Sequence, residues 1–113
     1  MDYKLLINGA LVDGHGTMPV LNPATEEVLT QCPTASEAQL DEAVDAAQAA
    51  FALWKNTSIE ERRQKLGEIA DAMDANQDEL ARILTEEQGK PLADAVGEIA
   101  GAALFFRYFQ SLD

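Results

Sequence analysis

The feature that most constrains the fold is a change in hydrophobic period at Ser36. Before it, short extended runs alternate with turn residues; after it, apolar residues recur three or four positions apart. That spacing lines one face of an α-helix. In the first helical stretch the apolar stripe is Leu40, Val44, Ala47, Phe51 and Trp54. The pattern predicts four amphipathic helices over residues 36–112.

The helix starts carry local signals of their own. A capping box satisfies exposed backbone N–H groups with two side chains three positions apart. The pairs that fit it are Ser36 with Gln39, Ser58 with Glu61 and, less typically, Asn76 with Glu79. Pro91 opens the last helix, because proline is favoured in a first helical turn. Gly89, just before it, is predicted to end the third helix.

Residues 1–33 predict an antiparallel β-ribbon. The runs "YKLLI" and "ALV" flank Asn8-Gly9, the strongest short hairpin signal. Residues 27–32, "EVLTQC", alternate as a strand does, and Pro33 is expected to end that strand. The fold class is therefore an α+β segment, with a β-ribbon over 1–33 followed by four α-helices over 36–112.

The last helix has more apolar surface than such a small domain can cover. Its sequence "LFFRYF" is apolar around nearly the whole girth, and such a helix needs neighbours on every side. We expect the chain either to be cut in mid-fold or to present this face to another subunit. Its longest apolar run, residues 99–106, is much shorter than the roughly 20 residues of a membrane span.

Charge and cysteine content exclude several classes of partner. The 113 residues hold 20 acidic and 8 basic side chains, for a net charge of −12. A chain this acidic is a poor match for nucleic acid or for an anionic membrane surface. It has a single cysteine, so no internal disulfide framework forms, and no secretory signal begins it. A cytoplasmic location is predicted.

Few residues suggest chemistry on their own. Cys32 has no base nearby in sequence to activate it, and His15 has no second metal ligand beside it. Glu87 stands near a helix C-terminus, where the dipole disfavours an anion, so a bound cation would relieve that cost. Gly97 and Gly101 lie one turn apart in the last helix, which favours close helix packing slightly over room for a ligand. "QGKP" lacks the pattern of a phosphate-binding loop.

Several motifs together resemble a known family. In order and spacing, the chain is similar to the N-terminal region of the NAD(P)-dependent aldehyde dehydrogenases, most closely to the semialdehyde dehydrogenase branch. The motifs that carry the resemblance are "LLINGALV", "VLNPATEEVLTQCPTAS", "LDEAVDAAQAAFALW", "ERRQKLGEIAD", "ELARILTEEQGKPLADAVGEI" and "FFRYF".

The resemblance implies an α/β, Rossmann-like enzyme of which residues 1–113 are one incomplete part, the N-terminal segment of the cofactor-binding domain. Members oxidise an aldehyde to an acid: a cysteine thiolate attacks the carbonyl, and hydride passes to NAD or NADP. The catalytic cysteine and glutamate lie beyond these residues, and Cys32 does not match the nucleophile motif. The chain alone is therefore expected to be inactive and to bind no cofactor tightly, and its partners would be the rest of the fold and further copies in a homo-oligomer.

The resemblance also implies two binding features. Some members hold Na+ or K+ at positions matching Val20, Leu21 and Glu87. In others, one face of the last helix borders the substrate tunnel, and Gly97 and Gly101 match that face. The alternative from another class is a stand-alone helical module that binds a protein through its apolar last helix.

Overall fold

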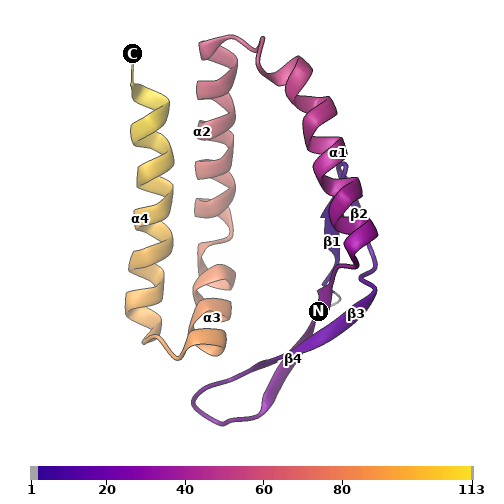
Figure 1. The fold of residues 1–113 in the computed structure, drawn as a ribbon. Coiled ribbons are helices and arrows are strands. Elements are labelled where there is room, and N and C mark those ends of the chain that lie inside the picture. Colours follow the sequence, from indigo (N-terminus) through magenta and orange to yellow (C-terminus); the bar gives the residue numbers. More distant parts are fainter. Residues whose placement is uncertain (1–2, 113) are drawn as a thin grey trace. The chain divides into compact units, whose positions relative to one another are not determined.

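A computed structural model describes residues 3–112, which form four strands followed by four helices (Figure 1). The contacts divide the chain into two compact units. The first contains the chain up to Leu21 together with Glu26–Asn56, and the second contains Asn22–Thr25 together with the chain from Thr57. The predicted order of a β-ribbon and four helices is confirmed, with the ribbon made of two separate two-stranded sheets.

The first sheet is a short hairpin. Strands β1 (Leu5–Ile7) and β2 (Ala10–Val12) are antiparallel, with Leu6 opposite Leu11. The turn between them has positive φ at both residues, 51° at Asn8 and 76° at Gly9. Two positive φ angles define the type I′ turn, which matches the twist of a hairpin. The hairpin predicted at Asn8-Gly9 is therefore present.

The second sheet corrects the prediction for Pro33. Strands β3 (Gly16–Leu21) and β4 (Val28–Thr34) are antiparallel, and Pro33 lies within β4 opposite Thr17 instead of ending the strand. Proline removes one hydrogen-bond donor and is tolerated on edge strands. Both strands of a two-stranded sheet are edges, so the ladder accommodates it.

Helix α1 (Glu37–Trp54) begins as predicted, and its apolar stripe has no cover within the described chain. The Gln39 amide N–H donates to Ser36 Oγ at 3.2 Å, and the Ser36 N–H donates to Gln39 Oε1 at 3.0 Å. Gln39 Nε2 also donates to the Asp13 carbonyl at 2.8 Å, which ties the helix start to the loop after β2. No residue of α1 is buried, and large members of its stripe such as Phe51 are exposed.

In the second unit, α2 (Ile59–Ala75) and α3 (Gln77–Gln88) meet at Asn76. Ser58 and Glu61 form the predicted capping box of α2. Asn76 does not cap α3: its Nδ2 donates back to the Ala72 carbonyl at 2.8 Å and so finishes α2. A single residue between two helices serves one end at a time, and the predicted Asn76–Glu79 box is wrong for that reason.

Helix α4 (Leu92–Ser111) packs along both α2 and α3 (Figure 1). The buried apolar residues of this unit are all alanines, each at most 2% exposed: Ala70, Ala81, Ala95 and Ala103. Gly67 on α2 is also buried, and a Cβ there would lie 2.4 Å from the Gln110 side-chain amide of α4. The helices therefore approach closely through small side chains.

Ion pairs add to the packing of α4 on α2. Arg107 of α4 bonds to Asp74 and, at 2.9 Å, to Asp71 of α2. The hydrogen bonds that Arg107 donates to Asp74 and, to a smaller extent, to Asp71 raise the pKa of Arg107 above its ordinary value. Arg63 of α2 donates to the carbonyl of Leu112, a cation at the negative end of α4. Forty-nine positions separate these two residues, and no local pattern in the sequence indicates that contact.

The turn between α3 and α4 depends on one glycine. Gly89 ends α3 with φ of 76°, and its N–H donates to the Thr85 carbonyl at 2.8 Å. A Cβ at Gly89 would lie 3.0 Å from Cγ of Pro23. The helix end predicted at this residue is therefore confirmed, and the Asn22–Thr25 loop packs against it.

Replacing Gly89 or Gly97 by alanine should change the free energy of unfolding in opposite directions. Gly89→Ala should lower the free energy of unfolding by about 1–2 kcal/mol, because a side chain in the left-handed region costs roughly that much. Gly97 has helical surroundings with no atom within 4 Å of a Cβ, so Gly97→Ala should raise it by up to about 1 kcal/mol. Urea denaturation followed by circular dichroism measures both; changes of the same sign would contradict the assignment.

Candidate functional site

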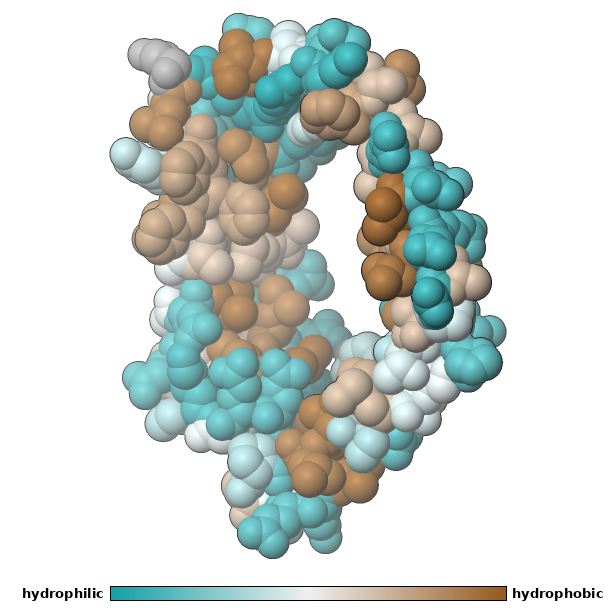
Figure 2. Space-filling view, viewed as in Figure 1, coloured by the Kyte–Doolittle hydropathy of each residue, from teal (hydrophilic) through white to brown (hydrophobic). Residues whose placement is uncertain are grey.

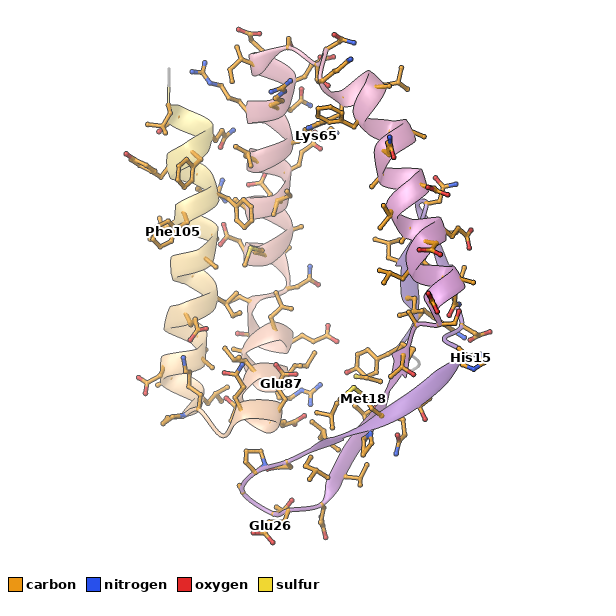
Figure 3. The ribbon with its side chains drawn as sticks, in the orientation of Figure 1. His15, Met18, Glu26, Lys65, Glu87 and Phe105 are labelled. Atoms are coloured by element: carbon orange, nitrogen blue, oxygen red, sulfur yellow. The ribbon has the colours of Figure 1, made fainter. Side chains whose placement is uncertain are left out.

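The outward face of α4 carries several large, exposed apolar side chains. Leu104 and Phe105 are 67% and 69% exposed, and Tyr108 and Phe109 are more than half exposed. Figure 2 shows apolar side chains gathered over this part of the helix, and Phe105 points away from α2 in Figure 3. Gly101, Leu104, Phe105 and Tyr108 line an open hollow of about 390 Å³. We call these four residues the α4 face.

Two of the predicted site residues lie on or near this face. Gly101 lines the hollow, and Gly97 lies one turn before it and is exposed. Apart from the adjoining residues and backbone of α4 itself, no atom lies within 4 Å of a Cβ built on either glycine. Among residues 3–112, therefore, no helix packs closely against them, and the packing explanation that the sequence slightly favoured is not met within the described chain.

The three residues expected to hold a monovalent cation lie in different units. Val20 and Leu21 are the last residues of β3, in the first unit, and the β3–β4 register breaks between them. Glu87 is an exposed residue of the last turn of α3, in the second unit (Figure 3). The last turn of α3 holds no basic residue, so the Glu87 carboxylate stands at the negative end of the helix dipole.

A larger hollow, of about 510 Å³, lies between α2 and the end of α4, and two of its acidic residues, Glu68 and Asp71, are engaged in ordinary surface pairs. Glu68 accepts from Lys65 Nζ at 2.6 Å and from Gln64 Nε2 at 2.9 Å. These hydrogen bonds lower the pKa of Glu68 below its ordinary value, and the bond from Lys65 has the larger effect. Asp71, also in its lining, pairs with Arg107. We assign this hollow to the packing of the two helices.

Cys32 and His15 remain unremarkable in the structure. Cys32 is a half-buried thiol in β4, and His15 is an exposed loop residue whose backbone N–H donates to the Thr34 carbonyl at 2.9 Å. Within residues 3–112 no three His, Cys, Asp or Glu side chains are grouped as a metal site. In the same residues, no helix has both the length and the apolar content needed to cross a membrane.

The described residues do not fit a nicotinamide dinucleotide by themselves. A helix N-terminus that binds pyrophosphate must offer free N–H groups. The N-termini of α1 and α2 are occupied by their own capping boxes, and acidic side chains follow in the first turns of all four helices. Residues outside this chain would have to hold such a cofactor.

Comparison with known proteins identifies the family. The sequence profile described as "Aldehyde dehydrogenase family" matches residues 11–112. A probable aldehyde dehydrogenase of a Pseudomonas species is 47% identical over 110 residues, which cover 97% of this chain and 22% of that protein. The chain therefore belongs to the aldehyde dehydrogenase family, and the resemblance drawn from the sequence is confirmed.

Solved structures agree with this assignment. The crystal structure of PnpE in complex with nicotinamide adenine dinucleotide superposes with a TM-score of 0.91 at 34% identity, over 97% of this chain and 23% of that one. Succinate-semialdehyde dehydrogenase from Burkholderia pseudomallei superposes with a TM-score of 0.89 at 42% identity, over 96% and 23%. The chain spans about a fifth of the length of the curated relatives it matches. A match across nearly the whole chain does not favour the stand-alone interaction module.

Proposed function

We propose that these residues serve in an NAD(P)-dependent aldehyde dehydrogenase that oxidises an aldehyde or semialdehyde to the carboxylic acid. The observation that carries the proposal is the family match over residues 11–112. The likeness to an NAD complex and to a succinate-semialdehyde dehydrogenase supports the cofactor and the substrate class. The family's catalytic cysteine and glutamate are supplied from outside these 113 residues.

Within that enzyme, residues 1–113 form the N-terminal segment of the cofactor-binding domain, and the remainder of the fold covers the α4 face. The exposure of Leu104 and Phe105 supports this arrangement, because roughly 25 cal/mol is gained for each Å² of apolar surface removed from water. The enzyme would act in the cytoplasm as a homo-oligomer, without nucleic acid or membrane as a partner; the acidic net charge of −12 supports the last point.

An activity assay tests the proposal. The full-length polypeptide should reduce NAD or NADP when an aldehyde such as succinate semialdehyde is added, and should sediment as an oligomer. The 113-residue chain should show no turnover and should self-associate through the α4 face. Full-length protein without aldehyde-dependent reduction of either cofactor would disprove the activity. A short chain that melts cooperatively as a monomer would disprove the covering of α4.

We also propose that Val20 and Leu21, through backbone carbonyls, and Glu87, through its carboxylate, hold Na+ or K+ in the complete enzyme. The position of Glu87 at the end of α3 supports this, since a cation there compensates both the carboxylate and the helix dipole. The register break between Val20 and Leu21 supports it too, because a regular ladder would occupy strand carbonyls.

Glu87→Gln should remove the stabilisation that K+ or Na+ confers on the full-length enzyme. A ligand that binds only the folded state raises the melting temperature with its concentration. The measurement compares melting in KCl, NaCl and choline chloride at equal ionic strength. Glu86→Gln is the matched control, since Glu86 pairs with Arg82 at 2.6 Å and the change in charge is the same. An unchanged K+ and Na+ response in Glu87→Gln would contradict the site.

Gly97 and Gly101 are proposed to form part of the wall of the aldehyde entrance. The lack of a side chain at both positions supports this, because the fold that covers Leu104 and Phe105 can leave a passage beside the two glycines. Gly101→Leu should raise KM for a bulky aldehyde by about tenfold or more, since a few carbon atoms in an apolar passage are worth about 1–3 kcal/mol. KM for a small aldehyde should change much less. Ala93→Leu, on an exposed part of the first turn of α4, is the control; equal effects of the two variants would contradict the proposal.

A further inference from the structure

We propose that the Asn8-Gly9 turn is a site of chemical modification, at which Asn8 converts to aspartate and isoaspartate and the isoaspartyl form opens the β1–β2 hairpin. The proposal concerns the first unit alone and is independent of the activity proposed above. It rests on the turn geometry, on the exposure of both residues, and on a contrast with the other asparagines of the chain.

The reaction requires only water. The backbone nitrogen of Gly9 loses its proton and attacks Cγ of Asn8, so that a C–N bond forms, the Cγ–Nδ2 bond breaks and ammonia leaves. Water then opens the five-membered succinimide at one of its two carbonyls. Opening at the side-chain carbonyl yields aspartate, and opening at the main-chain carbonyl yields isoaspartate. No electrons are transferred, and the net change is amide plus water to carboxylate plus ammonium.

The surroundings of the turn allow ring closure. Asn8 and Gly9 are both exposed, and no atom lies within 4 Å of a Cβ built on Gly9. A residue without a side chain offers the least steric resistance to a ring formed at its nitrogen. Apart from its two chain neighbours, no described residue therefore crowds Gly9 on the side where a Cβ would lie.

The three other asparagines of the chain lack this combination. Asn22 precedes Pro23, whose nitrogen has no proton to lose, and its Oδ1 accepts from the Ala24 N–H at 2.9 Å. Asn56 and Asn76 each donate through Nδ2 to a helix carbonyl, at 3.1 and 2.8 Å, and precede Thr57 and Gln77. Their amide groups are held, and the next residue carries a bulkier side chain than Gly9.

The hairpin must open for the nitrogen to reach Cγ, and the structure indicates that opening is inexpensive. Each strand has only three residues, and an isolated two-stranded hairpin is marginal in water. Leu6 and Leu11, opposite each other, are 70% and 72% exposed, so Ile7 at 6% is the buried side chain of this ribbon. Segments with so little burial open far more often than the whole protein unfolds.

The two products differ in their effect on the fold. Aspartate keeps the turn, because Asp-Gly also favours type I′. Isoaspartate carries the chain through its side-chain carbon, which adds a methylene to the backbone and moves the strands out of register. The pairing of Ile7 with Ala10 and the Lys4–Asp13 ion pair would then be lost, together with the packing of β1 on α1.

Peptide mapping tests the site directly. The chain is incubated in mildly alkaline buffer, with an acidic sample as reference, and is digested after lysine and before aspartate. This releases Asn8 in residues 5–12, Asn56 in residues 56–65 and Asn76 in residues 74–77. The second protease cuts before an aspartate newly formed from Asn8 but not at isoaspartate, so both products are counted. Conversion at Asn8 should be several-fold faster than at Asn56 or Asn76, and faster again in urea.

Two variants make the test decisive. Asn8→Gly keeps a turn that accepts positive φ but has no amide, and it should yield no product in residues 5–12. Asn8→Asp should keep the hairpin, measured as amide exchange in residues 5–12, whereas isolated isoaspartyl chain should exchange several-fold faster there. Equal conversion at Asn8, Asn56 and Asn76, or equal exchange in the isoaspartyl chain and in the Asn8→Asp variant, would overturn the proposal.

Discussion

Close contact between α4 and the pair α2 and α3 is the interaction on which the rest of the second unit depends. Its buried side chains are those of alanines, with Gly67 beneath Gln110, so the helices approach through their smallest residues. Such a contact buries little apolar area in each helix, which leaves the larger apolar side chains facing outward. The exposure of Leu104, Phe105 and Tyr108 is thus a direct consequence of how α4 packs, and it marks a surface suited to further protein.

The first unit also leaves large apolar side chains exposed, although local hydrogen bonds and not close helix packing define its structure. Its helix α1 starts at a well-formed capping box that is tied to the Asp13 loop, yet none of its residues is buried. Local hydrogen bonds therefore define where α1 begins, while its apolar stripe, with Phe51 and Trp54 among the exposed residues, has no cover within the described chain. Both units are well formed locally and incompletely covered, as befits a family member that spans about a fifth of its relatives.

Features that depend on neighbouring residues could be predicted from the sequence, and features that depend on distant ones could not. Contacts between residues at most three positions apart form the capping boxes at Ser36 and Ser58 and the turn at Asn8-Gly9. The capping box predicted at Asn76 was wrong because two helix ends compete for one side chain. The strand end predicted at Pro33 was wrong because the length of a strand depends on its partner strand. The α1 stripe predicted a face but not its burial, since periodicity does not say whether another element covers it. Gly97 and Gly101 were ambiguous for the same reason, as a mid-helix glycine permits close packing without requiring it.

Two segments of the motifs that carry the family resemblance, "NPAT" and "QGKP", lie against each other at Pro23 and Gly89. Gly89 has a left-handed backbone that ends α3, and a Cβ there would lie only 3.0 Å from Cγ of Pro23. Asn22 accepts from the Ala24 N–H and so shapes the loop that presents Pro23. Lys90 then pairs with Glu98 of α4, which leaves Glu87 without that cation as a neighbouring partner. The turn between α3 and α4 is thus also a packing site for the loop that contains Pro23. Because α3 ends at Gly89, the Glu87 carboxylate lies at the negative end of the α3 dipole.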